Sequence, residues 1–228
     1  MTRGDIPPVI MRGHGTNFHS VYGNLPAIYD AFSVSEVFDS ELSGLMGNLL
    51  HGTRLLDVAA GTGEKTKRYA SRFKSVVALD KSEALASYGT VHNRTDNMNF
   101  VVGTASSMPF PDGSFDRILT TWGSFTMAKA VPEMKRVLSK GGKIIRIGTC
   151  EKDGLTSLFP SFSLRRVSAV NRSYRNRGFF ESRHKVIIEF SSLKVAKKIL
   201  GAICGCNPDM VISRKIIHEV ALHVYRKH

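Results

Sequence analysis

Leu55-Leu56-Asp57-Val58-Ala59-Ala60-Gly61-Thr62-Gly63 decides the fold of this 228-residue chain. The stretch begins as an apolar strand, passes an acid at Asp57 and ends in a Gly-x-Gly turn. Because glycine has no side chain, the backbone at Gly61 and Gly63 can turn tightly and approach a ligand at the N-terminus of a helix expected from Glu64. The pattern predicts a loop that seats a nucleotide-type cofactor.

Two further apolar strands follow this loop. Val76 to Leu79 ends in Asp80, and a later strand leads to Ser107-Met108-Pro109-Phe110-Pro111-Asp112-Gly113-Ser114-Phe115-Asp116. Asp80 lies 17 residues past Gly63 at the carboxyl end of its strand, where a carboxylate accepts both hydroxyls of an adenosine ribose. The same charge would repel a phosphate on that ribose.

Two other nucleotide-binding loops fit less well. A phosphate-binding loop needs Gly-x-x-x-x-Gly-Lys-[Ser/Thr], but Ala59 stands where its first glycine belongs and Glu64 precedes Lys65. A dinucleotide-binding loop needs a third glycine where this chain has Thr66, so a nicotinamide enzyme would be atypical. A Gly-x-Gly pattern alone would also suit an ordinary strand-to-helix turn. The ordered strands and acids favour a cofactor site.

Alternating elements predict a parallel sheet covered on both faces. Apolar residues recur at helical spacing from Val34 to Leu50, so one amphipathic helix is expected there. Pro132-Glu133 suits the first turn of a later helix, and Lys140-Gly141-Gly142 suits its C-terminal cap. Strands are expected near 54–59, 75–80, 98–103, 115–120, 143–148, 184–190 and 220–225, and helices near 64–73, 82–91 and 193–204.

The ordered motifs between Tyr22 and Gly148 resemble the class I S-adenosylmethionine-dependent methyltransferases, in the branch of ubiquinone/menaquinone biosynthesis. The resemblance implies an α/β, Rossmann-like doubly wound fold with a mostly parallel seven-stranded sheet and antiparallel sixth and seventh strands. It also implies S-adenosylmethionine as cofactor and methyl transfer as activity. The expected layout is one domain, with an N-terminal lid and helix (1–52), a cofactor-binding core (53–149), a basic substrate-side insertion (150–183) and C-terminal strands and helix (184–228).

The resemblance also implies a set of cofactor contacts in this chain. They are Asp57, Ala59, Gly61, Gly63, Asp80, Lys81, Thr104, Ala105, Ser106, Thr120 and Tyr22. Two departures alter the pattern: Gly103-Thr104-Ala105 replaces the usual Gly-Asp-Ala, and Trp122 with Phe125 replaces residues that include a His pair in many relatives. No catalytic residue is assigned. By position, His14, His19 and Tyr22 are the candidates for a general base.

Positive charge is concentrated in the second part of the chain. Residues 101–228 carry 22 Lys and Arg against 9 Asp and Glu, which accounts for the whole net charge of +13. Between Leu164 and Lys185 stand Arg165, Arg166, Arg172, Arg175, Arg177, Arg183 and Lys185, with aromatic residues interleaved. Arginine with aromatics pairs anions and planar groups. Arg172, Arg175, Arg177 and Trp122 are therefore expected to bind the acceptor; the alternative is a solvated basic surface.

Composition and cysteine count give expectations for the cellular location and for metal binding. No apolar run is long enough to span a membrane, and the N-terminus lacks a secretory segment, so a cytoplasmic location is expected. Three cysteines, Cys150, Cys204 and Cys206, supply too few thiolates for a closed structural zinc site. No metal site is expected.

Three functions remain open at this point. The first is methylation of a small molecule or lipid precursor, anionic if the basic segment binds it. The second is methylation of RNA, although no recognisable RNA-binding module is present. The third is cofactor binding without catalysis. The sequence does not indicate an oligomeric state.

Overall fold

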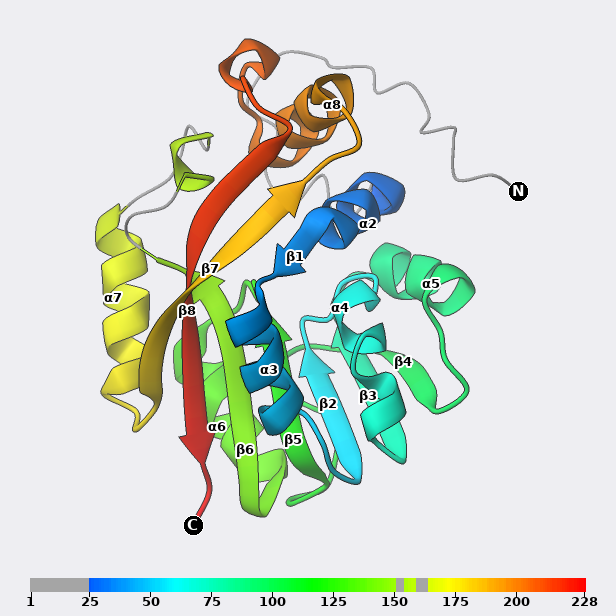
Figure 1. Ribbon diagram of the computed structural model, residues 1–228. Helices are drawn as coiled ribbons and strands as arrows, with labels where there is room; N and C mark the ends of the chain where they lie inside the picture. Colours follow the sequence, from blue (N-terminus) through cyan, green and yellow to red (C-terminus); the bar gives the residue numbers. More distant parts are fainter. Residues whose placement is uncertain (1–24, 151–153, 159–163) are drawn as a thin grey trace.

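Eight strands form one mixed sheet in the computed structural model, which describes residues 25–150, 154–158 and 164–228 (Figure 1). The strands are β1 (Glu36–Phe38), β2 (Arg54–Val58), β3 (Ser75–Asp80), β4 (Met98–Val102), β5 (Phe115–Thr121), β6 (Leu138–Thr149), β7 (Phe180–Glu189) and β8 (Lys215–Arg226). Their order across the sheet is β1-β7-β8-β6-β5-β2-β3-β4.

The core of the sheet is parallel, as predicted. Neighbours among β4, β3, β2, β5 and β6 all pair in parallel. β8 pairs antiparallel with β6 and with β7, so β7 points in the same direction as the core strands. The predicted fold class is confirmed, and the short edge strand β1, antiparallel to β7, is an additional eighth strand.

The predicted helix from Val34 to Leu50 is wrong. Helix α2 (Pro26–Ser35) ends before β1, and a separate helix α3 (Ser40–Leu49) begins after it. Asp39 is the N-cap of α3, because its carboxylate accepts a hydrogen bond of 2.8 Å from the backbone N–H of Leu42. The three residues between the helices pair with Val186–Ile188 of β7. Pairing with β7 thus interrupts the predicted helix near its start, and α3 forms the larger part of it.

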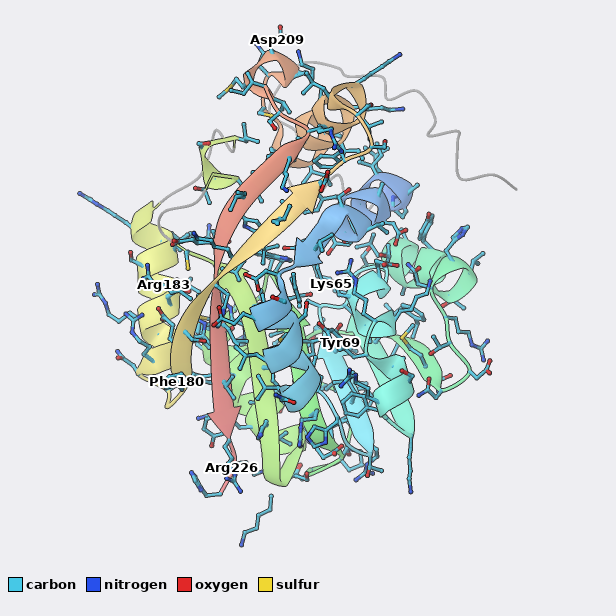
Figure 2. All side chains as sticks on the ribbon, in the orientation of Figure 1. Lys65, Tyr69, Phe180, Arg183, Asp209 and Arg226 are labelled. Carbon is cyan, nitrogen blue, oxygen red and sulfur yellow. The ribbon has the colours of Figure 1, made fainter. Side chains whose placement is uncertain are left out.

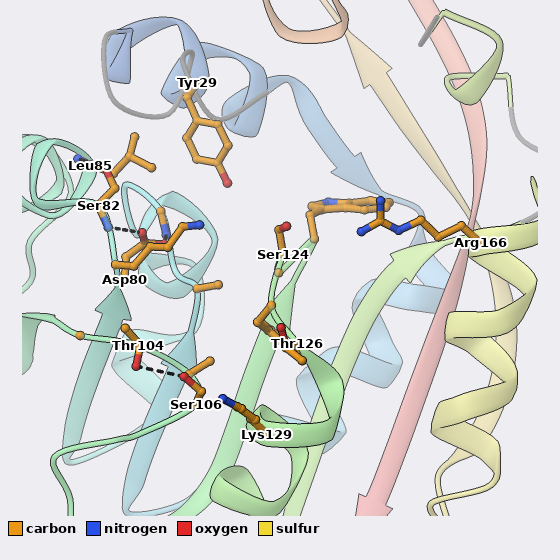
Figure 3. Close-up of a pocket in the computed structure, with 18 residues that line it drawn as sticks. Tyr29, Asp80, Ser82, Leu85, Thr104, Ser106, Ser124, Thr126, Lys129 and Arg166 are labelled. Carbon is orange, nitrogen blue, oxygen red and sulfur yellow. Dashed lines mark hydrogen bonds between the residues drawn. The ribbon is translucent and has the colours of Figure 1, made fainter. Parts of the chain in front are cut away.

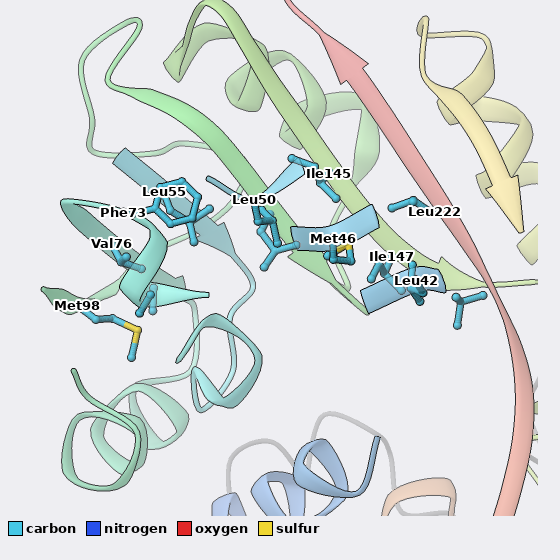
Figure 4. Close-up of a cluster of buried hydrophobic side chains, with 14 of the residues drawn as sticks. Leu42, Met46, Leu50, Leu55, Phe73, Val76, Met98, Ile145, Ile147 and Leu222 are labelled. Atoms are coloured by element: carbon cyan, nitrogen blue, oxygen red, sulfur yellow. The ribbon is translucent and has the colours of Figure 1, made fainter. Parts of the chain in front are cut away.

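Helices cover both faces of the sheet. Besides α2 and α3 they are α4 (Glu64–Lys67), α5 (Glu83–His92), α6 (Met127–Val137), α7 (Leu164–Arg175) and α8 (Leu193–Cys204), with 3-10 turns at Ala70–Arg72, Thr156–Leu158 and Pro208–Met210. Neighbouring strand residues serve opposite faces: Leu55 packs with α3 (Figure 4), whereas Leu56 packs with α6. Each fully buried leucine contributes roughly 1.5–3 kcal/mol. The continuous apolar strands of the sequence follow from this two-sided burial.

The region around α6 differs from the sequence prediction. Pro132 lies inside α6 and not in its first turn, at the cost of one helical hydrogen bond. Lys140-Gly141-Gly142 lies within β6 and not at a helix cap. Gly141 has a left-handed φ of 75°, and the pairing with β5 shifts register between Phe115 and Arg117. The two glycines therefore allow an irregular start of the strand.

Helices α2 and α8 pack together beside the sheet (Figure 1). Ile28 and Phe32 of α2 join Leu200 of α8 and Phe190 in one buried cluster. Ser192 caps the start of α8 by accepting from the N–H of Val195, and Gly205 ends the helix with a left-handed φ of 66°. This packing holds α2 against the carboxyl ends of the central strands, where it contributes a side chain to the site.

Candidate active site

The loop after β2 has the backbone that the Gly-x-Gly pattern predicts. Gly61 and Gly63 adopt φ angles of 60° and 73°, and Ala59 also lies in the left-handed region at 61°. A Cβ on Gly61 would lie 2.6 Å from the ring of Tyr29, so the close approach requires glycine. Ala59 stands where the resemblance has glycine, and holding it there costs about 1–3 kcal/mol. Such strain is typical of ligand-binding loops.

Asp80 lies beside this loop at the end of β3. Its carboxylate accepts backbone hydrogen bonds of 2.8 Å from Gly61 and 2.8 Å from Ser82, one on each oxygen. Each carboxylate oxygen can accept more than one bond. Asp80 therefore fixes the loop and keeps acceptor capacity for two neighbouring hydroxyls of a ligand.

Asp57 lies behind the loop and does not line a cavity. One oxygen accepts a 2.6 Å hydrogen bond from Thr66 Oγ1, and Oδ1 has no hydrogen-bond partner among the described residues. Burial raises the pKa of Asp57 to about 7, although Thr66 and Lys65 act to lower it. Asp57 Oδ1 therefore keeps unused acceptor capacity inside the fold, behind the loop.

A cavity of about 690 Å³ opens at the carboxyl ends of the central strands (Figure 3). This volume lies within the range of small-molecule pockets, roughly 300–1,000 Å³. Eight predicted site residues line it: Ala59, Gly61, Asp80, Lys81, Thr104, Ala105, Ser106 and Trp122. The other lining residues are Tyr29, Ser82, Leu85, Gly103, Gly123, Ser124, Phe125, Thr126, Lys129 and Arg166. The carboxyl ends of separate strands thus converge on one cavity, as the parallel sheet predicts.

Gly63 and Thr120 lie next to this cavity but outside its lining. Gly63 is the N-cap of α4, where a Cβ would lie 2.6 Å from Phe100. Thr120 is buried in β5, and its Oγ1 would lie 2.5 Å from a Cβ on Gly123. Both residues shape the cavity wall from behind.

Trp122 is held by a buried polar network that the sequence did not predict. Its indole N–H donates a 3.0 Å hydrogen bond to Glu36 Oε2, which lies 2.6 Å from Lys65 Nζ. The ring of His218 lies 5.4 Å from the indole, nearly parallel to it. Burial alone would raise the pKa of Glu36, but Lys65 and His218 lower it to about 2. Figure 2 shows Lys65 beneath α2. Glu36 is therefore a buried carboxylate that positions a cavity wall.

Tyr29 of α2 closes the cavity over the glycine loop, and the sequence interpretation named Tyr22 for that role. Tyr22 lies outside the described residues. Burial, and then the charge of Asp80, raise the pKa of Tyr29 well above its ordinary value, so the phenol is neutral. Asp30, the next residue, accepts hydrogen bonds of 2.7 Å from Thr62 Oγ1 and from the amide of Asn93. These bonds tie α2 to the loop.

The predicted acceptor-binding arginines do not line the cavity. Arg172 and Arg175 are exposed on the last turns of α7, where Arg175 pairs with Glu181. Arg177 follows that helix and donates to the backbone oxygen of Ser173 at 3.0 Å. Arg183 lies on β7 beside α7 (Figure 2). Among the described residues, the arginine that lines the cavity is Arg166, from the first turn of α7.

Within the described ranges, no group of three or more His, Cys, Asp or Glu side chains could hold a metal ion. No described helix combines the length and apolar character needed to cross a bilayer.

The sheet order, the strained glycine loop and the strand-end cavity together define a class I, Rossmann-like methyltransferase fold. Residues 56–146 match the family described as "Methyltransferase domain". This match agrees with the resemblance stated from the sequence, and S-adenosylmethionine is the methyl donor that this family implies.

Known proteins show the same likeness. A demethylmenaquinone methyltransferase of Renibacterium salmoninarum is 40% identical over 97 residues, 41% of this chain and 40% of that protein. A ubiquinone/menaquinone biosynthesis C-methyltransferase of Hahella chejuensis is 29% identical over 158 residues, 56% of this chain and 64% of the relative. The matched region thus spans less than two thirds of either relative. The crystal structure of an S-adenosylmethionine-dependent methyltransferase from Aquifex aeolicus has a TM-score of 0.56 at 16% identity, covering 87% of this chain and 97% of that one.

Proposed function

We propose that this protein transfers a methyl group from S-adenosylmethionine to a small-molecule acceptor. The observation that carries the proposal is the cavity itself, in which the strained loop at Ala59 and Gly61 faces the acid of Asp80. The family match and the curated relatives, which are methyltransferases of quinone biosynthesis by name, support the same activity.

The residues present fit this cofactor. Asp80 keeps acceptor capacity for the ribose hydroxyls, and Gly61 lets the ring of Tyr29 pack closely over the loop, where a Cβ would meet it. Leu85 and the Gly103–Ser106 segment line the cavity beside Asp80, where an adenine would stack and pair with backbone groups. When bound, S-adenosylmethionine supplies an activated methyl group, so that the acceptor's lone pair forms the new bond while the carbon–sulfur pair returns to sulfur.

The protein's own contribution is alignment and exclusion of water. Tyr29 covers the loop, and Trp122 and Phe125 supply apolar walls on the opposite side. Alignment of two reactants is worth about 7–11 kcal/mol in favourable cases. Among the described lining residues, Asp80 is the sole carboxylate, and it accepts two backbone bonds. The described cavity is therefore built for positioning more than for proton abstraction.

Two measurements test the proposal. Calorimetric titration should show binding of S-adenosylmethionine and S-adenosylhomocysteine, and much weaker binding of NAD and ATP. Incubation with methyl-labelled S-adenosylmethionine and separate fractions of small metabolites, extracted lipids and tRNA should then transfer label to the small-metabolite or lipid fraction. Tight NAD or ATP binding without a response to the sulfur compounds would refute the proposal, and labelling confined to tRNA would replace its acceptor class.

A further inference from the structure

The first half of α8 and the loop before β8 form an exposed surface that is both basic and apolar (Figure 1). We call it the α8 tip, and it consists of residues 193–198 and 209–215. We propose that the α8 tip docks on an anionic lipid bilayer. None of its members is among the described residues that line the cavity, so this proposal does not depend on methyl transfer.

Two large apolar side chains project from the loop of the tip. Ile212 is 87% exposed and Met210 is 52% exposed. Val211 between them is buried in the cluster that α2 and α8 share, and its backbone is extended. Because alternate residues of an extended chain point to opposite sides, Met210 and Ile212 point away from the protein. An anchored loop that holds two apolar side chains in water is suited to insertion among lipid headgroups.

Positive charge accompanies these side chains. From residue 193 to residue 215 the chain has one acid, Asp209, and five basic residues: Lys194, Lys197, Lys198, Arg214 and Lys215. The three lysines of α8 are spaced three and four residues apart and share one face of the helix, whereas Ala196 and Leu200 are buried. An anionic leaflet attracts such a cluster of cations.

Three contacts join the basic helix face to the apolar loop. Lys197 Nζ lies 3.1 Å from Asp209 Oδ1, at the start of the loop. At its other end, Arg214 donates a 3.0 Å hydrogen bond to the backbone oxygen of Phe190, and the N–H of Phe190 donates to the backbone oxygen of Arg214 at 2.9 Å. Arg214 also pairs with Glu189 at 2.9 Å. With these two acids paired, positive charge remains in excess over the whole surface.

The tip lies at the end of the sheet where the cavity opens. The pairing of β6 with β8 ends at Thr149 and Val220, and Lys215 lies further along β8, beyond the carboxyl end of β6. Figure 2 shows Asp209 at this extremity of the molecule. Docking of the tip would therefore turn the cavity end of the sheet toward the bilayer.

A bilayer is the partner that suits both properties of the tip. Anionic headgroups would pair with the lysines, and the layer beneath them would take up Met210 and Ile212. Nucleic acid would engage the cations through its phosphates but would leave these apolar side chains in water. Peripheral attachment generally requires two such weak signals acting together.

The test is sedimentation of the full-length protein with lipid vesicles. The vesicles are made either of phosphatidylcholine alone or of equal parts of phosphatidylcholine and phosphatidylglycerol. The apolar variant carries Met210→Ser and Ile212→Ser. Its matched control carries Val91→Ser and Val102→Ser, which replace side chains of 76% and 54% exposure on α5 and on β4, at the other edge of the sheet.

The charge variant carries Lys194→Gln and Lys215→Gln. Its matched control carries Lys74→Gln and Lys140→Gln, which replace exposed lysines near the amino ends of β3 and β6. A fifth protein, Ile212→Trp, reports insertion by fluorescence, with the parent, whose sequence has the single tryptophan Trp122, as its background.

The parent should bind the mixed vesicles and bind phosphatidylcholine only weakly, and added salt should weaken binding. Each cation near an anionic surface strengthens binding about fivefold, so the charge variant should lose about twentyfold. The apolar variant should lose at least about tenfold, and neither control should change. The emission of Ile212→Trp should shift to shorter wavelength on the mixed vesicles.

Three results would overturn the proposal. The first is equal binding of the parent to both kinds of vesicle. The second is a loss in the charge variant with none in the apolar variant, which together with binding of duplex RNA would assign the tip to nucleic acid. The third is a lipid-free dimer that the apolar variant separates, which would assign the tip to a second copy of this chain.

Titration with S-adenosylhomocysteine keeps this proposal separate from the methyltransferase proposal. Its affinity should be unchanged in all variants, because none of the replaced residues lines the described cavity. If the parent does not bind S-adenosylhomocysteine, the methyltransferase proposal fails, and the vesicle measurements still decide whether the α8 tip docks on a bilayer.

Discussion

The buried pair between Glu36 and Lys65 yields the sharpest prediction about stability. Both side chains are almost fully buried, at 1% and 6% exposure. Replacing Lys65 by Met would leave Glu36 uncompensated and should lower the free energy of unfolding by about 3–5 kcal/mol. Replacing both, as Glu36→Gln with Lys65→Met, should recover most of this loss, because the glutamine amide keeps an acceptor for the indole of Trp122.

The pH dependence follows from the pKa of Glu36. Its folded-state pKa of about 2 lies below the ordinary 4.5, so the stabilisation is complete above about pH 6 and is lost as the pH falls from about 4.5 through about 2. At 1.36 kcal/mol per pKa unit the full contribution is about 3 kcal/mol, of which about 2 kcal/mol disappears between about pH 6 and pH 3.

Urea denaturation of the parent and of the double variant at both pH values measures this difference. Other carboxylates titrate in both proteins, so the quantity of interest is the parent's extra loss of stability on acidification. Asp96→Asn is the control, because Asp96 is an exposed carboxylate in a turn. An identical loss in the parent and the double variant would refute the assignment of Glu36 as a paired, ionised carboxylate.

Three further predictions concern the cofactor side of the cavity. Asp80→Ala should weaken S-adenosylhomocysteine binding by about 1.5–3 kcal/mol in calorimetry while the protein stays folded, and an unchanged affinity would contradict its role. Gly61→Ala should abolish that binding, because a Cβ meets Tyr29 at a φ of 60°, whereas Gly44→Ala, with open space around its Cβ, should not. The parent should lose stability between about pH 4 and about pH 8, because Asp57 has a raised pKa of about 7 and its ionisation destabilises the fold. Asp57→Asn does not ionise and should therefore gain stability relative to the parent over this range. A difference in unfolding free energy between the two proteins that stays constant with pH, measured by urea denaturation, would argue against this.

The geometry of the glycine loop and the position of Asp80 could be predicted from the sequence, because both depend on local signals. Glycines and acids that follow an apolar run mark the end of a strand in the sequence. Parallel strands place their carboxyl ends at one edge of the sheet, so these residues are expected to lie together. Asp80 and Gly61 therefore meet at hydrogen-bond distance although 19 residues separate them. The strand boundaries of the core follow equally well, because apolar runs bounded by turn residues are local signals.

The position of Arg166 in the cavity lining could not be predicted from the sequence, because it depends on the phase of one helix. Successive arginines on a helix point in different directions, so a run of cations does not reveal which of them faces the protein. Burial of Asn171 and Tyr174 sets the phase of α7, so that Arg166 lines the cavity whereas Arg172 and Arg175 do not. Asn171 carries no periodic apolar signal, and its partner Arg146 lies on another element.

The strand β1 explains both the error in the predicted helix from Val34 to Leu50 and the unpredicted network under Trp122, because Glu36 belongs to β1 and bonds the indole. Outside the masked segments, Ala59 and Trp122 are the two non-glycine residues with left-handed backbone, and both line the cavity. Strain at Trp122 persists only if other contacts hold the residue in place. The carboxylate of Glu36 supplies such a contact, and it can do so because residues 36–38 leave the helical path to form β1. The break in the helix thus brings a buried acid to the one tryptophan in the cavity wall, at the expense of a longer helix that the periodicity alone would favour.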